Sequence, residues 1–400
     1  MSIADRAVHD DHAIARLMRF LAVEGITGRE KGIGQEVVKA LKEIGIPAGA
    51  VRFDEADQRI PVPTQTGNLI VKLPGTCPGP RLLFMTHLDT VPLGAGAVPV
   101  RQGNRIVPQG ATALGGDNRT GVAVLVTLAA SLRERKLPHP PLTLLFTVRE
   151  ESGLYGARHL DPADLEGPVL GFNVDGKEAA GITIGAVGAE RWEVDITGRA
   201  AHAGVHPEEG ISATMVAALA LADAKRDGWF GRVKQGANEG TSNVGPFGGR
   251  NGKAAGDATN VVTDYVHILG EARSHDAKFF KKITAAYKAA FRAAAKQVTD
   301  HKGRVAKLKF TSRIDYYPFR LKPDTPVVRH AEAAARAAGL EPALRISNGG
   351  LDANWLVKHG IPTVTIGAGQ NQAHTIDEYV DLRQYLAGCR MALSLATLTR

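Results

Sequence analysis

Cysteine is nearly absent from this chain of 400 residues, which contains only Cys77 and Cys389. Two cysteines are too few for a disulfide framework, and their wide separation in the sequence excludes a metal-binding pair made by these two alone. This usage is typical of a protein from a reducing compartment.

The chain also lacks long apolar runs, and none reaches the roughly 20 residues that a membrane-spanning helix needs. Its first residues, MSIADRAVHDDHAI, carry charges where a signal peptide would have its apolar core. We find no low-complexity segment and no internal repeat. These features predict a cytoplasmic globular protein without a membrane partner.

Basic residues exceed acidic ones, with a formal net charge of +8, but no concentrated basic patch accompanies this excess. The densest group, Lys281, Lys282, Lys288 and Arg292, recurs on one face of a predicted helix. Such a face is more often solvated than bound to a nucleic acid. We therefore expect no nucleic-acid partner.

The length of the chain predicts two domains, because 400 residues exceed what one compact core usually holds. Helical and strand-like patterns of the α/β type fill residues 1–183 and resume over residues 319–400. Between them, residues 184–318 follow the order strand, helix, two strands, helix, strand. That split βαβ order predicts an inserted, ferredoxin-like α+β domain.

The stretch LTLLFTVREESGLYG, residues 142–156, joins a nearly continuous apolar run to two adjacent acids, Glu150 and Glu151. The run is typical of a strand that is covered on both faces. Carboxylates are almost never buried unless they are paired or bind a metal. A solvated loop would explain one such pair of acids, but three other strand-like runs end in residues of the same kind.

Each of these other runs leads to a potential metal ligand at its carboxyl end. The runs are residues 81–86, followed by His87 and Asp89; residues 169–174, followed by Asp175; and residues 362–367, followed by a loop with His374. In open α/β sheets the ligand site lies beyond the carboxyl ends of the strands. Asp117 joins this group, because a glycine turn places it at the start of a helix. Two histidines with several carboxylates predict a site for zinc or a similar divalent ion.

The spacing within the motifs agrees with this chemistry. In an extended His87-x-Asp89 segment both side chains point to the same side, so Asp89 can fix the tautomer of His87. Glu150 and Glu151 point apart, so one can bind a metal while the other transfers protons. The candidate ligands exceed the needs of one tetrahedral ion, which predicts two ions sharing a carboxylate at a separation of about 3.5–4 Å.

Several motifs closely resemble those of the M20 metallopeptidases, and the nearest subgroup is the peptidase T-like proteins. In the α/β part they are THLDTV (86–91), GGDN (115–118), REESGLYGA (149–157), NVDG (173–176) and AHTIDE (373–378). In the insertion they are GRAAHAGVHPEEGISA (198–213), SNVGPFGG (242–249) and GEARSHD (270–276). The resemblance covers nearly the whole chain. It implies a zinc-peptidase-like catalytic domain with a mostly parallel central sheet, and an inserted domain that serves as a lid or for dimerisation.

The resemblance also implies the metal ligands. His87, Asp117 and Asp175 would hold one Zn²⁺, while Asp117, Glu151 and His374 would hold the other. Co²⁺ and Mn²⁺ remain alternatives to zinc. Asp117 is thus the implied bridging carboxylate.

The remaining candidate residues have implied roles in catalysis and substrate binding. Glu150 would be the general base for a metal-bridging water that attacks the amide carbonyl, and Asp89 would be the orienting acid. His202, Asn243 and Arg273 occupy positions whose family counterparts contact substrate, in some cases across a homodimer. His202 is also a candidate to stabilise the oxyanion.

The function that follows is a di-zinc exopeptidase for short peptides, with a tripeptide aminopeptidase of the peptidase T type as the first candidate. An M20-type carboxypeptidase or an N-acyl-amino-acid deacylase is the alternative, since fold and metals do not set specificity. A non-catalytic binding protein on the same fold is a third reading. The presence of Glu150 and of every implied ligand argues against this third reading.

Overall fold

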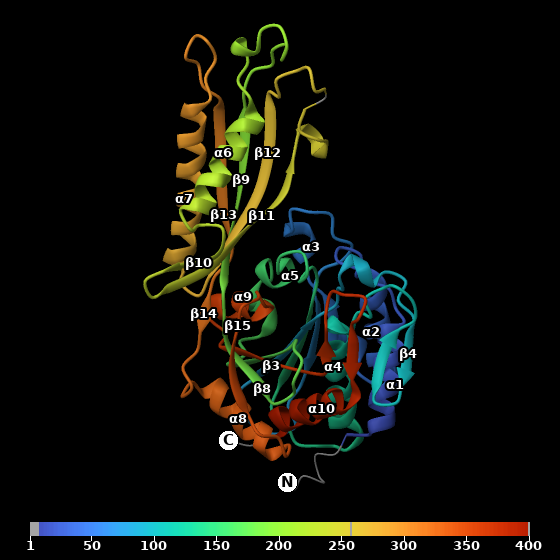
Figure 1. The fold of residues 1–400 in the computed structure, drawn as a ribbon. Coiled ribbons are helices and arrows are strands. Elements are labelled where there is room, and N and C mark those ends of the chain that lie inside the picture. Colours follow the sequence, from blue (N-terminus) through green and yellow to red (C-terminus); the bar gives the residue numbers. More distant parts are fainter. Residues whose placement is uncertain (1–7, 257, 399–400) are drawn as a thin grey trace. The chain divides into compact units, whose positions relative to one another are not determined.

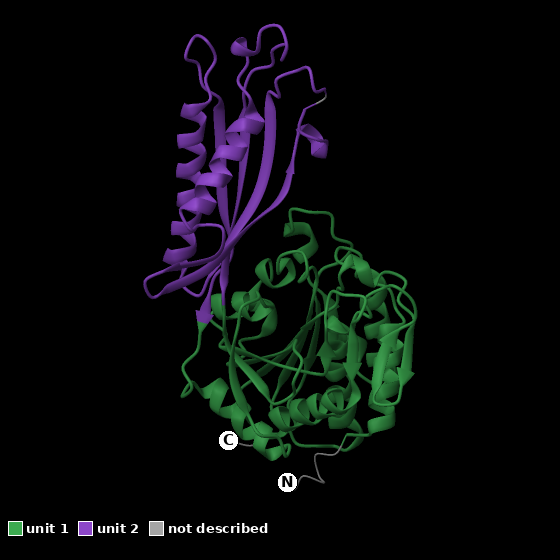
Figure 2. Cartoon of the chain, viewed as in Figure 1, with its two compact units in different colours: residues 1–186, 320–400 green, residues 187–319 purple. Residues whose placement is uncertain are grey.

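The computed structural model describes residues 8–256 and 258–398, which form two compact units (Figures 1 and 2). Unit 1 contains the residues up to Ala186 and those from Arg320 onward, and unit 2 contains Val187–Phe319. Each unit has its own sheet and its own apolar core. The expected α/β class with a central sheet is confirmed.

The sheet of unit 1 has four parallel strands at its centre. In sheet order its strands are β1 (Val51–Phe53), β2 (Leu69–Leu73), β6 (Leu142–Thr147), β3 (Leu82–His87), β7 (Leu170–Val174), β16 (Thr363–Ile366), β8 (Gly181–Ala186) and β14 (Phe319–Arg320), with β15 (Ala343–Ser347) beside β8. Strands β6, β3, β7 and β16 run parallel, whereas β2 and β8 are antiparallel to their central neighbours. The carboxyl ends of the four central strands therefore meet at one edge.

Helices cover both faces of this sheet, which explains the continuous apolar runs of its strands. The larger core joins one face to α1 (Asp10–Leu21), α2 (Lys31–Glu43), α4 (Gly116–Glu134), α8 (Pro326–Ala337) and α10 (Leu382–Thr397). The opposite face packs against the short helices α5 (Tyr155–Arg158) and α9 (Asp352–Lys358), while α3 (Ala56–Arg59) follows β1. In β3, Phe84 belongs to the first core and Met85 to the second. None of the helices among the described residues combines the length and apolar character needed to cross a membrane.

A second, small sheet in unit 1 joins two segments that are far apart in the sequence. Its strands, in order, are β17 (Gln370–Asn371), β18 (Tyr379–Asp381), β5 (Arg105–Pro108) and β4 (Pro99–Gln102). The sequence predicts a short hairpin within residues 94–107 but not its partner strands, which are only two or three residues long. This sheet fixes both ends of the loop that carries His374.

Unit 2 consists of an antiparallel sheet with two helices packed on one face (Figure 1). Its strands, in order, are β10 (Gly231–Gln235), β11 (Asn238–Gly248), β12 (Tyr265–Ser274), β9 (Gly188–Thr197) and β13 (Lys307–Tyr316), and its helices are α6 (Ala213–Arg226) and α7 (Ala277–Gln297). Trp192 of β9 packs against Tyr287 and Phe291 of α7. Alternate residues of β9, such as Arg191 and Glu193, are more exposed and lie on the other face. Strand β10, which pairs with β11 as a hairpin, is the element of this unit that the sequence pattern does not predict.

Candidate metal centre and active site

Candidate ligands converge at the carboxyl edge of the unit 1 sheet. His87 is the last residue of β3, Asp175 follows β7, and Glu151 lies in the loop after β6. Asp117 is the second residue of α4 and follows Gly115, whose φ of 76° lies in the left-handed region that glycine adopts readily. His374 comes from the loop between β17 and β18.

Asp117 lies between the two histidines, with one carboxylate oxygen facing each of them. Its Oδ1 is 3.1 Å from His87 Nε2, and its Oδ2 is 3.3 Å from His374 Nε2. His87 Nε2 also lies 3.9 Å from Asp175 Oδ1, while His374 Nε2 lies 2.9 Å from Glu151 Oε1. The donor atoms of His87, Asp117 and Glu151 all lie within 4.8 Å of one another. The five implied ligands thus form two groups that meet at Asp117.

The hydrogen bonds of His87 define its tautomer. Its Nδ1 lies 3.0 Å from the backbone carbonyl oxygen of Asp89, which can only accept a proton. Nδ1 must therefore carry a hydrogen, so that in the neutral ring Nε2 is the nitrogen that can bind a cation. The Asp89 carboxylate is also close, with Oδ1 3.4 Å from Nδ1.

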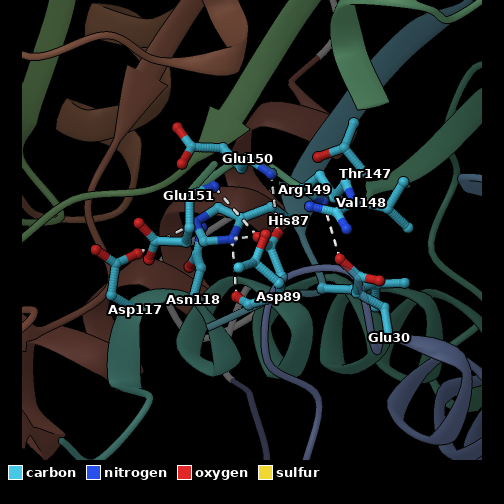
Figure 3. Close-up of polar contacts among 12 residues, drawn as sticks. Glu30, His87, Asp89, Asp117, Asn118, Thr147, Val148, Arg149, Glu150 and Glu151 are labelled. Carbon is cyan, nitrogen blue, oxygen red and sulfur yellow. Dashed lines mark hydrogen bonds and ion pairs between the residues drawn. The ribbon is translucent and has the colours of Figure 1, made fainter. Parts of the chain in front are cut away.

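The main role of the Asp89 carboxylate in the hydrogen-bond network is to accept from the loop that carries the two glutamates (Figure 3). Its Oδ1 accepts from the backbone N–H of Glu150 at 3.0 Å, and its Oδ2 accepts from that of Glu151 at 3.2 Å. Asp89 is fully buried. One side chain therefore ties the loop after β3 to the loop after β6.

Two further buried side chains hold the preceding residues of the same loop. Glu30, at the start of α2, accepts the backbone N–H of Arg149 at 3.1 Å and that of Gly28 at 2.7 Å, both through Oε1. Asn68 Oδ1 accepts the N–H of Val148 at 3.1 Å. Four consecutive N–H groups, those of residues 148–151, are thus bonded to side chains. The strand end that presents Glu150 is fixed by residues from three other segments.

Glu378 and Gln370 fix the positions of two candidate ligands. Glu378 is buried and accepts the backbone N–H groups of Gly115 and Asp117 through its two oxygens, each at 2.9 Å. Gln370 donates from Nε2 to Asp175 Oδ1 at 3.1 Å. The sequence pattern does not single out Glu30, Asn68, Gln370 or Glu378, because their roles depend on contacts between distant segments.

Burial of so many acids shifts their pKa values upward. Desolvation raises the pKa of Glu151 to about 7 and that of Asp175 to about 6, and it raises the pKa of Glu150 well above its usual range. Neighbouring negative charges add to each shift. Asp117 differs, because hydrogen bonds from His374 and His87 outweigh its burial and lower its pKa.

The pKa values of the two histidines are raised as well, because carboxylates lie beside them. Hydrogen bonds to Asp117 and Glu151 raise the pKa of His374 to about 10. Burial opposes the charged form of His87, but its bonds to Asp117 and Asp89 still raise its pKa above the usual value. In the metal-free protein, protons on the two histidines thus supply positive charge beside the buried carboxylates.

This donor set fits divalent metal ions. Imidazole nitrogen and carboxylate oxygen are the ligands that zinc and related ions prefer, and a cation would replace the protons that now stabilise the buried acids. Two groups that share Asp117 match the arrangement in which a carboxylate bridges two ions. Glu150 lies beside these groups without a place in either, which leaves it available for proton transfer.

The three predicted substrate contacts belong to unit 2. His202 is exposed and accepts the N–H of Gly204 through Nδ1 at 3.2 Å. Asn243 is exposed on β11. Arg273, on β12, forms a bidentate pair with Glu271 at 2.8 and 3.1 Å.

By their positions, Glu178 just after the NVDG motif and Asp352 in the NGGLDAN loop are candidates for binding the amino group of a peptide, and both have protein partners. Glu178 forms an ion pair with Arg345 at the surface of unit 1. Asp352, at the start of α9, is buried and accepts from the Thr147 hydroxyl. Burial raises the pKa of Asp352 to about 7.

The chain is similar to known proteins in sequence and in structure. Residues 83–398 match the family model described as Peptidase family M20/M25/M40. An uncharacterized protein of Bacillus subtilis, YqjE, is 31% identical over 389 residues, which cover 97% of this chain and 98% of that protein.

Two solved structures are similar over their full length. The aminopeptidase PepT from Bacillus cereus has a TM-score of 0.82 at 31% identity, with 98% of each chain covered. A tripeptidase from Staphylococcus aureus has a TM-score of 0.86 at 27% identity, also with 98% of each chain covered.

Proposed function

The chain belongs to peptidase family M20/M25/M40, and from this membership we propose that it is a two-metal aminopeptidase acting on short peptides, with tripeptides as the preferred substrates. The observation that carries the proposal is the position of Asp117 between two ligand groups, with Glu150 beside them as an additional acid. The similarity to an aminopeptidase and a tripeptidase supports the choice of substrate.

We assign His87, Asp117 and Asp175 to one ion, and Asp117, Glu151 and His374 to the other, with zinc as the first candidate and Co²⁺ or Mn²⁺ as alternatives. Bound ions of this kind lower the pKa of water and polarise a carbonyl oxygen. The backbone carbonyl of Asp89 keeps the Nε2 lone pair of His87 available for coordination.

Glu150 acts as the general base. It accepts a proton from the attacking water and returns that proton to the amine that leaves when the amide bond breaks. Burial raises the pKa of Glu150, which favours its taking up the proton of the attacking water. Asp89 holds the Glu150 backbone in place through its N–H group.

Unit 2 would act as a lid, in which His202, Asn243 and Arg273 contact the substrate. Closure over the substrate excludes water and completes the set of substrate contacts. This unit is also the surface through which we expect a homodimer, a point that sedimentation analysis would test. Two free cysteines, Cys77 and Cys389, agree with a cytoplasmic location.

The deciding experiment compares three substrates on the metal-loaded protein: tri-alanine, amino-acetylated tri-alanine, and acetylated amino acids. We expect hydrolysis of tri-alanine with release of its first residue, and little hydrolysis of the two acetylated classes. Efficient hydrolysis of acetylated amino acids, with tri-alanine intact, would assign the protein to the deacylase alternative. Release of the last residue from both tri-alanine forms would indicate a carboxypeptidase.

A further inference from the structure

Arg119 is a buried cation in the first turn of α4, two residues after the candidate ligand Asp117. The residue is only 2% exposed. Burial lowers the pKa of Arg119 to about 10, while the carboxylates of Asp89, Glu30 and Glu378 oppose this shift. The guanidinium therefore stays charged at neutral pH. A buried ion is seldom more stabilising than apolar side chains of the same volume, so the charge calls for an explanation other than packing.

The guanidinium group of Arg119 joins two segments that are distant from α4 in the sequence. In the described part of the chain, its hydrogen bonds all go to backbone carbonyl oxygens. Nε donates to Phe20 at 3.2 Å, and Nη2 donates to Val23 and Gly25 at 3.2 and 3.4 Å. Nη1 donates to Leu88, which follows β3. A Cβ atom at residue 25 would lie 2.8 Å from Nη2, so this close approach requires glycine.

The bond to Leu88 lies at the centre of the His87-x-Asp89 segment. The Leu88 N–H donates to the Thr147 carbonyl at 2.7 Å, and the Leu88 carbonyl accepts from Arg119. The backbone of Leu88 is thus fixed on both sides. Its carbonyl belongs to the peptide unit that also contains the N–H of Asp89, so a rotation of this unit would move Asp89. Asp89 contacts His87 through its backbone carbonyl and holds the loop after β6 through its carboxylate.

We propose that Arg119 is a positioning residue that fixes His87 and Asp89 relative to Asp117. Asp117 lies at the start of α4, and the side chain of Arg119, two residues later, bonds to the segment between His87 and Asp89. This link supports the 3.1 Å separation of Asp117 Oδ1 and His87 Nε2 within one ligand group. The guanidinium fork bonds to Leu88 and to the end of α1 at once, whereas the donors of a lysine all lie on one nitrogen. The proposal rests on the proposed function, because it treats His87 and Asp117 as metal ligands.

The test measures metal binding, tri-alanine hydrolysis and the NMR signals of the His87 ring nitrogens in wild type, Arg119→Met and Arg119→Lys. Loss of a residue that orients metal ligands typically costs about 10–100-fold in metal affinity or activity. We expect Arg119→Met to lose metal affinity by about this factor, and to lose kcat by a similar factor at saturating metal with KM little changed. Arg119→Lys, which keeps the charge but loses the fork, should give intermediate values. In the metal-free protein the His87 signals should move in both variants.

Arg133→Met is the matched control, because Arg133 is an exposed arginine at the other end of α4. If Arg119 only stabilises the end of α1, its variants would unfold more easily but keep wild-type metal affinity, kcat and His87 signals, and this result would overturn the proposal. If Arg119→Met does not fold, Arg119→Lys decides by the same measurements. If wild type neither binds metal nor hydrolyses tri-alanine, the proposed function fails on its own. The His87 signals of the metal-free protein then decide, and wild-type signals in Arg119→Lys would refute the positioning role.

Discussion

Replacing Glu30 tests whether the hydrogen bonds beneath the catalytic loop control the position of Glu150. Glu30 is fully buried and far from Glu150 in the sequence, yet its Oε1 accepts the N–H of Arg149, the residue before Glu150. Its Oε2 has no hydrogen-bond partner among the described residues. The residue therefore acts on this loop as an acceptor through a single oxygen.

Glu30→Ala removes the acceptor of two buried N–H groups, those of Gly28 and Arg149. A buried donor left without a partner costs about 1–3 kcal/mol, so the loop should relax to recover these bonds. A shift of about 1 Å at a reacting group can cost about 100-fold in rate. We expect kcat to fall by about 10–100-fold, while KM and metal content stay unchanged, because Asp89 still holds the N–H groups of Glu150 and Glu151.

Glu30→Gln provides the conservative rescue, because its side-chain oxygen can accept the same two bonds. We expect kcat within about 3-fold of wild type, since a neutral acceptor is only somewhat weaker than a charged one. The unfolding free energies of wild type and Glu30→Gln should depend differently on pH. Burial raises the pKa of Glu30 from 4.5 to about 7, so ionisation of this group destabilises the metal-free protein as pH rises through that interval. Relative to wild type, Glu30→Gln should gain about 3 kcal/mol in unfolding free energy between pH 4 and pH 8.

Steady-state kinetics on metal-loaded variants and denaturant unfolding of the metal-free forms provide these values. Glu36→Ala is the control, because Glu36 lies on the same helix and forms a partly exposed ion pair with Arg19, away from the catalytic loop. Wild-type kcat in Glu30→Ala would refute the positioning role. Equal loss in Glu30→Gln and Glu30→Ala would show that the charge of Glu30 matters and not its acceptor geometry.

Three other predictions concern the catalytic residues and their protons. Glu150→Gln should keep its metal but lose turnover by about 10²–10⁴-fold, and full activity would mean that the base is misassigned. Metal binding at pH 7 should release protons, because the pKa of His374 is about 10 and that of Glu151 about 7 in the metal-free protein. Metal affinity should then fall as pH falls below 7. Calorimetry of metal binding in buffers of different ionisation enthalpy would detect the released protons. Equal binding heats in all buffers would contradict proton release. His202→Ala should lower turnover without metal loss, whereas an unchanged rate would leave His202 as a surface residue.

The sequence predicts the central sheet well because its strands are buried on both faces. The continuous apolar runs before His87, Glu150 and Asp175 each form a parallel strand, and their shared direction brings the three side chains to one edge. The sequence pattern does not predict the small strands β17 and β18, because two or three residues are too few to show a periodic pattern. Their pairing with β5 depends on contacts that only the folded chain provides.

The candidate ligands are visible in the sequence because each follows a recognisable strand or glycine turn. The residues that hold them are not visible in this way. Glu30 precedes an amphipathic helix and looks like an ordinary cap, although its carboxylate bonds to a loop more than 100 residues away. Glu378 belongs to the AHTIDE motif, but its contacts with Gly115 and Asp117 come from chain folding and not from local spacing.

Metal titration of the wild-type protein and of Asp117→Ala tests the central claim most directly. We predict that the metal-free protein binds two ions per chain and that hydrolysis of tri-alanine appears with this loading. Asp117→Ala should weaken both sites together, because each oxygen of Asp117 faces a different ligand group. Full activity at one ion per chain, or an Asp117→Ala variant that keeps one site at wild-type affinity, would contradict a centre built on a shared aspartate.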